Sequence, residues 1–524
     1  MNRAVMLRRL EQSPQTDFLI IGGGATGLGI AVDAQSRGFR SVLLEAEDFA
    51  KGTSSRSTKL VHGGVRYLEQ GDIPLVLEAL KERGLLHQNA PHIVHHLSFI
   101  VPRYKWWEGP FFGIGLKVYD ALAGRLKLGS SKMLSREETL QRIPNVEPEN
   151  LLGGVEYFDG QFDDARLAIT LAQTAAHLGG CLLNHARVTQ LTKKDGLVNG
   201  AEFTDQLSQK TYRVEARVVI NATGIFTDQI RRLDDPQAVP SVQPSQGVHL
   251  VFSKDFLPSN SAVMVPHTDD GRVLFVIPWH NRVIVGTTDT AMSEPEIEPR
   301  ALDEEVEFIL RNASRYLAKS PTRKDILSIF AGQRPLVRPP NKGGGDTATK
   351  SISRNHEIFV SDSGLLTVAG GKWTTYRKMA EDALDHALQL SGHGHSSCVT
   401  EHLHLHGWRN ARASEQDDLL RVYGTDVFEL QVLCEEDPRW QEPLHPKLPY
   451  PKGVIPWSVR HEMAFTVEDV LARRTRALFL EAAAAAEVAP EVADIMRLEL
   501  GLSEEWAKDQ VTTFRALARG YSIF

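Results

Sequence analysis

The feature that most constrains the fold is a glycine-rich turn between two short apolar runs near the N-terminus. Residues 18–21 have the length and composition of a buried parallel strand, and residues 42–44 form a second such run. Residues 30–37 read as a helix between them. The second run ends in Glu45, whose carboxylate can accept hydrogen bonds from a ribose. This order of strand, turn, helix and strand predicts an α/β unit that binds a nucleotide.

The turn itself has the residues that a dinucleotide needs. Gly22 permits the tight turn after the strand, Gly24 lets the backbone approach a pyrophosphate, and Gly27 lets helix and strand pack closely. Ala25 and Thr26 follow at the start of the helix, where free N–H groups and positive potential favour phosphate. We therefore predict a Rossmann-like domain with a dinucleotide at this turn.

Composition excludes several classes of protein. The chain has 524 residues, enough for two to four domains. A net charge of −7 without a basic stripe argues against a nucleic-acid partner. Cys181, Cys398 and Cys434 are far apart and odd in number, which suits a reducing compartment rather than a disulfide framework. We expect neither a signal peptide nor a membrane-spanning helix, because no apolar run is long enough.

Residues 51–69 are dense in hydroxyl groups, cations and glycines. The hydroxyls, including those of Ser57 and Thr58, suit phosphate and ribityl oxygens, and a Gly-Gly pair lets the backbone run against a flat ring. The alternative is a polar surface loop, but the nucleotide motif just upstream favours a binding role. From this run we assign to the cofactor site Thr53, Ser54, Ser55, Lys59, Leu60, His62 and Gly63.

Four stretches carry a resemblance to a known family. The run TSSRSTKLVHGGVRYLE at 53–69 resembles the FAD-dependent glycerol-3-phosphate dehydrogenases, within the superfamily of D-amino-acid-oxidase-like flavoproteins. AGQRPLV at 331–337, SISRNHE at 351–357 and AGGKWTTYR at 369–377 resemble further motifs of that family, although Trp373 replaces a smaller residue. The resemblance covers nearly the whole chain and implies that the dinucleotide is FAD.

The resemblance also implies the architecture. It predicts a Rossmann-like FAD-binding domain with an antiparallel-sheet substrate cap and a C-terminal all-α domain. We assign residues 14–90, 155–245 and 355–392 to the FAD-binding domain, residues 91–154 and 246–354 to the cap, and residues 400–524 to the helical domain. The further cofactor contacts that it implies are Val188, Ala222, Thr223, Gly224, Gly371, Lys372, Trp373 and Thr374.

The activity implied is the oxidation of sn-glycerol 3-phosphate to dihydroxyacetone phosphate, with hydride passing from C2 to flavin N5. Such a reaction needs a hydride acceptor, a base for the hydroxyl proton, and clamps that fix the substrate. His62 and His249 are both candidates for the base, although His249 also suits a buried strand. The residues that we expect to bind the substrate are Arg66, Tyr67, His249, Arg334, Arg354 and Lys372, of which His249, Arg334 and Lys372 join His62 as catalytic.

The resemblance implies a quinone as the electron acceptor. It therefore implies a cytoplasmic protein that is attached peripherally to the inner (cytoplasmic) membrane. A homodimer is compatible with this interpretation. Three alternatives stay open: an oxidase that uses oxygen, an amine or amino-acid oxidase, and a non-catalytic flavin or RNA-associated protein. The cationic residues argue against the second and the negative charge against the third. We predict no metal site, since His92, His95 and His96 lack nearby ligands.

Several structural expectations can be tested directly. The aromatic residues of 103–117 suit either a lipid headgroup layer or a buried capping helix, and we favour burial. Helical spacing over 73–88 predicts that Leu77, Leu80 and Leu85 are core. Residues 418–435, 466–485 and 506–518 read as helices, and we expect Arg476 on a solvated face.

Overall fold

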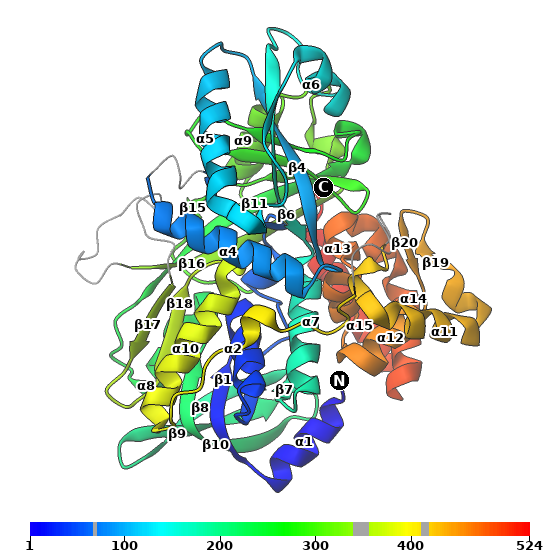
Figure 1. The fold of residues 1–524 in the computed structure, drawn as a ribbon. Helices are drawn as coiled ribbons and strands as arrows, with labels where there is room; N and C mark the ends of the chain where they lie inside the picture. The colour runs from blue at the N-terminus through cyan, green and yellow to red at the C-terminus, as the bar shows by residue number, and fades with distance from the viewer. Residues whose placement is uncertain (66–70, 339–355, 410–418, 524) are drawn as a thin grey trace.

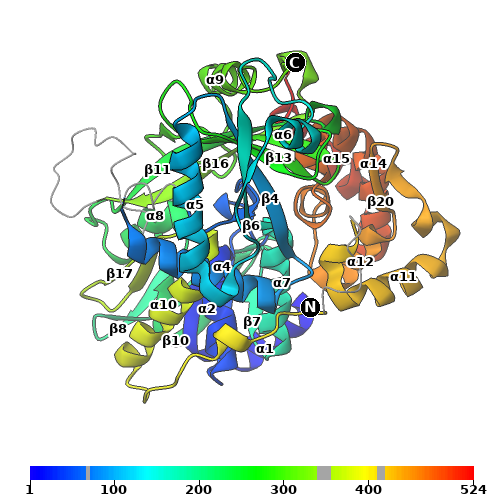
Figure 2. The same cartoon turned by 45° about the horizontal axis from the view of Figure 1, so that its top comes forward.

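Two large sheets and a set of C-terminal helices make up most of the described residues, with a small two-stranded sheet beside them. The computed structural model describes residues 1–65, 71–338, 356–409 and 419–523. In Figure 1 one sheet with its helices lies in the lower part, the second sheet lies above it, and the orange and red C-terminal helices gather on one side. Figure 2 shows the same arrangement from a second angle. The predicted α/β fold class is confirmed.

The first sheet carries the N-terminal motif. Within the described residues it has eight strands, with the order β17-β18-β10-β1-β2-β7 and a β8–β9 hairpin beside β10. β10, β1, β2, β7 and β18 run parallel. The bounds are β1 Gln15–Ile21, β2 Ser41–Leu44, β7 Cys181–Leu183, β8 Ala186–Lys194, β9 Leu197–Asp205, β10 Lys210–Asn221, β17 His356–Val360 and β18 Leu366–Gly370. This is the parallel sheet that the strand–glycine–helix pattern predicts.

Helix α2 (Ala25–Ser36) covers β1 and β2, with α7 (Asp164–His177) and α10 (Tyr376–Ser391) on either side of it. Phe18, Leu19 and Ile20 of β1 are fully buried beneath these helices. The helix begins directly at Ala25, five residues earlier than predicted, so the glycine-rich segment forms its first turn. The N-terminus of α2 therefore stands at the carboxyl end of β1, where a pyrophosphate binds in this fold.

The second sheet forms the upper part of the molecule. Its described strands follow the order β15-β11-β14-β13-β12-β4-β6-β3, with β16 beside β11 and β5 beside β6. Most neighbours are antiparallel, and β11 places His249 opposite Phe330 of β16. The bounds are β3 Leu60–Val61, β4 Val94–Arg103, β5 Lys132–Leu134, β6 Gly153–Phe162, β11 Val242–Ser253, β12 Ala262–Val265, β13 Leu274–Trp279, β14 Arg282–Gly286, β15 Thr290–Ala291 and β16 Ser328–Val337.

The C-terminal helices pack on the second sheet through one apolar cluster that includes Phe330 and Phe479. The predicted single helix over 466–485 is wrong. A π-helical turn spans Asp469–Arg474, and Arg476, with a left-handed φ of +62°, interrupts the helix before α13 begins. The remaining elements are α1 Arg3–Gln12, α4 Ile73–Asn89, α5 Glu108–Ala123, α6 Arg136–Arg142, α8 Thr227–Asp234, α9 Asp303–Ala313, α11 Val427–Glu436, α12 Val454–Glu462, α13 Ala477–Leu480, α14 Ala482–Leu500, α15 Glu504–Arg519, β19 Pro443–His445 and β20 Leu448–Pro451.

Arg476 is not on a solvated face as predicted; its side chain is 1% exposed. The Asp164 carboxylate, itself fully buried at the start of α7, lies 3.1 Å from the Arg476 guanidinium. A buried carboxylate needs a nearby cation, because an unpaired charge is costly in the interior. The pairing is between residues 312 apart in sequence, which is why the local pattern missed it.

Two expectations about surfaces are also corrected. Leu77 is 43% exposed, because α4 buries its other face through Leu80 and Leu85. On α5 and the turn before it, Trp106 is 79% exposed and Phe111 50%, so the favoured interpretation of buried aromatics is wrong there. Helix α5 packs against the protein through Leu116, Tyr119 and Ala123, and its outer face exposes apolar side chains to the surface. Among the described helices, none combines the length and apolar character needed to cross a bilayer.

Candidate active site

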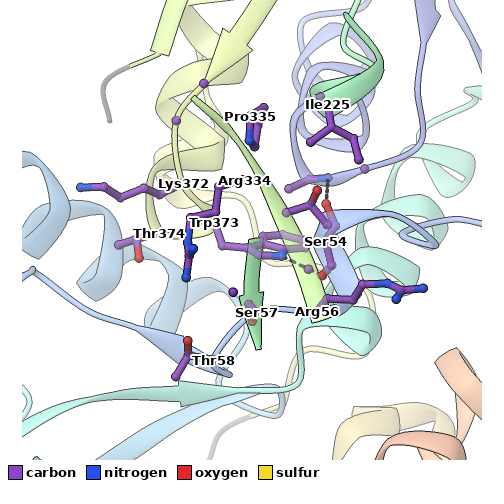
Figure 3. Close-up of a pocket in the computed structure, with 18 of the residues that line it drawn as sticks. Ser54, Arg56, Ser57, Thr58, Ile225, Arg334, Pro335, Lys372, Trp373 and Thr374 are labelled. Atoms are coloured by element: carbon purple, nitrogen blue, oxygen red, sulfur yellow. Dashed lines mark hydrogen bonds between the residues drawn. The ribbon is translucent and has the colours of Figure 1, made fainter. Parts of the chain in front are cut away.

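A cavity of about 1500 Å³ lies between the two sheets. It exceeds the roughly 300–1,000 Å³ of most small-ligand pockets and so has room for a large cofactor and a substrate. Figure 3 shows part of its wall. The predicted site residues that line it are Gly22, Gly24, Ala25, Thr26, Glu45, Thr53, Ser54, Leu60, His62, Val188, Ala222, Thr223, Gly224, His249, Arg334, Gly371, Lys372, Trp373 and Thr374.

At one end of the cavity, the turn after β1 presents backbone. Gly22 has a φ of +111°, which disfavours any residue with a side chain. A Cβ on Gly27 would stand 1.9 Å from the carbonyl oxygen of Gly22, so only glycine lets α2 begin this close to β1. Ser54 Oγ accepts the N–H of Ala25 at 2.9 Å. The first turn of α2 borders the cavity, and this cradle fits the pyrophosphate of a dinucleotide.

Glu45 follows the end of β2 and borders the cavity. Its two carboxylate oxygens accept the N–H groups of Gly23 at 2.6 Å and Glu47 at 2.8 Å. Burial raises the pKa of Glu45, while these two backbone hydrogen bonds oppose the rise. The carboxylate therefore fixes the turn after β1 as well as bordering the cavity.

Three distant segments meet in the middle of the cavity. Trp373 Nε1 donates to the carbonyl of Ser54 at 2.9 Å, which is one of the two dashed lines in Figure 3. Thr53 Oγ1 donates to the carbonyl of Gln333 at 2.6 Å, and the N–H of His62 donates to Thr374 Oγ1 at 3.3 Å. The indole of Trp373 thus supplies a hydrogen bond that a leucine at this position could not make.

His249 faces the cavity from β11. Its Nε2 is 2.9 Å from Thr58 Oγ1, and its ring stacks on Phe330 with centroids 4.7 Å apart. Burial and the positive charges of Lys59 and Arg334 hold the pKa of His249 well below its usual value. The imidazole is therefore neutral at physiological pH.

Arg334 reaches the cavity from β16. Its guanidinium donates to the carbonyl of Thr288 at 3.2 Å and lies 3.8 Å from the Asp289 carboxylate. The side chain keeps a quarter of its surface exposed and lines the cavity. Lys372 lines the same cavity, although in Figure 3 its side chain extends away from Arg334.

Some predicted site residues lie behind the cavity wall. Gly63 donates its N–H to Tyr119 at 2.8 Å, while Ser55 and Gly27 are buried in packing. Lys59 is fully buried, its Nζ 2.7 Å from the Asp164 carboxylate and in contact with three aromatic rings. Burial lowers the pKa of Lys59 to about 7. Arg66, Tyr67 and Arg354 fall outside the described residues.

Other residues of the wall were missed by the sequence reading. They include Arg56, Arg187, Ile225, Thr287, Asp289 and Pro335. No local feature of the sequence links Asp289 to Arg334, which is 45 residues further along the chain. The guanidinium of Arg56 also borders the cavity, but it already pairs with the Glu298 carboxylate at 2.7 Å. Its role is to hold the wall rather than a ligand.

Ligand atoms of Asp48, His185 and Asp469 form a potential metal cluster, lying within 4.8 Å of one another among the described residues. Arg473 and Arg474 contact the Asp48 carboxylate at 2.6 and 2.7 Å. Two guanidinium groups already neutralise this carboxylate. The cluster is therefore accounted for by ion pairs.

Comparison with known proteins places the chain in a family. Residues 17–377 match the family of FAD dependent oxidoreductases, and residues 366–507 match the C-terminal domain of alpha-glycerophosphate oxidase. The probable mitochondrial glycerol-3-phosphate dehydrogenase of Caenorhabditis elegans is 41% identical, over 98% of this chain and 74% of its own length. The mitochondrial enzyme of Homo sapiens is 38% identical, with the same shares covered.

Solved structures agree. The glycerol-3-phosphate dehydrogenase from Bacillus halodurans complexed with FAD is 30% identical, with a TM-score of 0.81 over 99% of this chain and 97% of that one. The L-alpha-glycerophosphate oxidase from Mycoplasma pneumoniae, 19% identical with a TM-score of 0.55 over 73% of this chain and 96% of that one, shares the fold. The prediction of FAD is confirmed, and the chain belongs to the FAD-dependent glycerol-3-phosphate dehydrogenases.

Proposed function

We propose that the protein oxidises sn-glycerol 3-phosphate to dihydroxyacetone phosphate and delivers the electrons to a quinone at a membrane surface. One observation carries the proposal. Arg334 and Lys372 border the same cavity as the glycine-rich turn that fits FAD, so cationic groups and the dinucleotide cradle share one space. Bound FAD supplies the acceptor for the hydride from C2.

Arg334 is assigned to the phosphate. Its planar guanidinium suits a phosphate dianion, and Thr288 and Asp289 hold it in place from behind. Lys372 adds a second positive charge, which favours the negative charge that develops on the C2 oxygen as its proton leaves. Arg66, Tyr67 and Arg354 stay predicted substrate contacts from the sequence.

His62 is assigned as the base. A base must take up a proton during the reaction, and the cations around His249 oppose a positive charge on that imidazole. His62 is half-buried at the cavity wall, and its backbone is anchored to Thr374. We assign His249 the role of a neutral hydrogen-bonding group beside the substrate.

The outer face of α5 supports the membrane part of the proposal. Trp106, Phe111, Ile114 and Val118 are between 43% and 79% exposed on this segment. Trp107 lies 5.8 Å from the ammonium of Lys105, a mixture of aromatic and cationic groups that suits a lipid headgroup layer. Other residues of the same segment, Phe112 and Leu116, border the cavity, so the proposed membrane face and the proposed site share one helix.

The test is a spectrum of the purified holoprotein. Adding glycerol 3-phosphate without oxygen should bleach the flavin absorbance, whereas glycerol and amino acids should not. A soluble quinone should then restore the colour faster than air does. Absence of bleaching refutes the substrate assignment, and faster recovery in air refutes the quinone in favour of an oxidase.

A further inference from the structure

The side chain of Thr58 stands between the cavity and the buried charges behind it. The cavity wall includes Thr58, which Figure 3 labels beside Ser57. Its hydroxyl is 2.9 Å from His249 Nε2. The other ring nitrogen of His249, Nδ1, is buried and has no hydrogen-bond partner among the described residues. Thr58 therefore supplies the polar contact that sets how this imidazole is turned.

The backbone on both sides of Thr58 is held by one carboxylate. Asp164 Oδ2 accepts the hydroxyl of Ser57 at 2.7 Å and its N–H at 3.0 Å, and it pairs with Lys59 Nζ at 2.7 Å. Lys59 also has a left-handed φ of +63°, which a residue with a side chain adopts only when its surroundings hold it there. The hydroxyl of Thr58 is thus aimed by a clamped turn.

The clamp extends to the C-terminal helices. Arg476 donates to Asp164 Oδ1 at 3.1 Å and to the carbonyl of Ser55 at 2.8 Å. The ring of His249 is held on its face as well, since Phe330 stacks on it and Lys59 lies 5.0 Å from the Phe330 ring centroid. Both members of the Thr58–His249 pair are therefore held by neighbouring side chains behind the cavity wall.

We propose that Thr58 is a positioning residue for the reaction: its hydroxyl fixes the orientation of His249, and Asp164 holds the turn that carries Thr58 through Ser57 and Lys59. The proposal rests on the function proposed above. An imidazole that can turn loses its alignment with the reacting carbon, which lowers the rate more than it lowers substrate affinity.

The experiment compares steady-state kinetics of holoproteins carrying Thr58→Val and Thr58→Ser. Valine keeps the shape and removes the hydroxyl, so kcat should fall about tenfold, which corresponds to one lost hydrogen bond, with KM within about threefold. Serine restores the hydroxyl and should return kcat to within about twofold. Flavin content and melting temperature should match those of the unaltered protein in both variants. Loss of FAD in Thr58→Val, or no change in kcat, overturns the proposal.

A double-mutant cycle separates positioning from direct contact with the substrate. In a His249→Phe background, which keeps a ring for stacking, Thr58→Val should change kcat less than twofold. An equal loss in both backgrounds overturns the proposal, because Thr58 then acts without His249. Bleaching of the unaltered protein is measured first. Its absence refutes the proposed function, whereas normal bleaching with an unaffected Thr58→Val refutes the positioning role alone.

Discussion

The two ends of the cavity are built in different ways. The end that fits the pyrophosphate comes from one continuous stretch, β1, the glycine turn and the start of α2, with Ser54 as a nearby partner. The other end, which is the proposed substrate end, takes His62, His249, Arg334 and Lys372 from four separate segments of the sequence. The first end is fixed by local backbone geometry, and the second by long-range pairing of side chains.

This difference indicates where each end is vulnerable. At the pyrophosphate end a single added methyl group collides with backbone, so damage is steric and confined to the cofactor. At the proposed substrate end, removing a charged side chain behind the cavity wall should destabilise the wall. The reason is that buried ion pairs hold the wall residues in place. Four substitutions test this contrast.

The largest effect is expected from Arg476→Met, behind the substrate end. It leaves the Asp164 carboxylate without one of its two cations, and breaking a buried pair costs about 3–5 kcal/mol. The midpoint of urea unfolding, followed by circular dichroism, should fall accordingly. Arg497→Met is the control, because Arg497 pairs with the exposed Asp494 and should change stability by less than about 1 kcal/mol. Equal unfolding midpoints for the two variants would show that the Arg476–Asp164 pair does not stabilise the fold more than a surface pair does.

Arg334→Ala tests the cavity side of the same end. Loss of a charge-assisted contact to phosphate costs roughly 3 kcal/mol, so KM for glycerol 3-phosphate should rise about 100-fold while FAD stays bound. Arg338→Ala is the matched control, since Arg338 is four residues further along, exposed, and bonded to Gln243. An unchanged KM for Arg334→Ala would remove it from the substrate site.

Gly27→Ala tests the pyrophosphate end. The added Cβ would lie 1.9 Å from the backbone oxygen of Gly22, and overpacking of this kind costs about 1–3 kcal/mol. Because the strain falls on the cradle, FAD affinity should drop about tenfold, measured by titrating the apoprotein with FAD. Gly394→Ala has open space around it and should bind FAD normally. Normal binding by both variants would contradict the steric account.

The same contrast explains how much the sequence could predict. The strand, glycine turn and helix of residues 15–36 follow from local spacing, so their type and role could be predicted. The position of Arg476 could not, because its burial depends on Asp164, which lies 312 residues away. Thr58 was visible as one hydroxyl among several, but its partner His249 is 191 residues further along. The exposure of Trp106 could not be predicted either, because the same apolar sequence suits a buried helix and an exposed apolar surface.

The smallest effect is expected from His185→Asn, at a second buried pair behind the cavity. Burial alone lowers the pKa of His185, but Asp469, 3.1 Å from Nε2, more than offsets this and raises the net pKa above its usual value. The folded protein then holds a proton that the unfolded chain releases near pH 6.5, so this contribution to stability is complete below that pH. It is lost as pH rises through the folded-state pKa.

The melting temperature of the unaltered protein should therefore exceed that of His185→Asn most at pH 5.5, and the gap should narrow towards pH 9. The slope is limited to about 1.4 kcal/mol per pH unit, the maximum for one proton. Asparagine tolerates the left-handed φ of +51° at this position, so backbone strain does not confuse the comparison. His395→Asn, on an exposed histidine, should leave the curve unchanged. A gap that stays constant with pH would mean that Asp469 supports the fold without sharing a proton with His185.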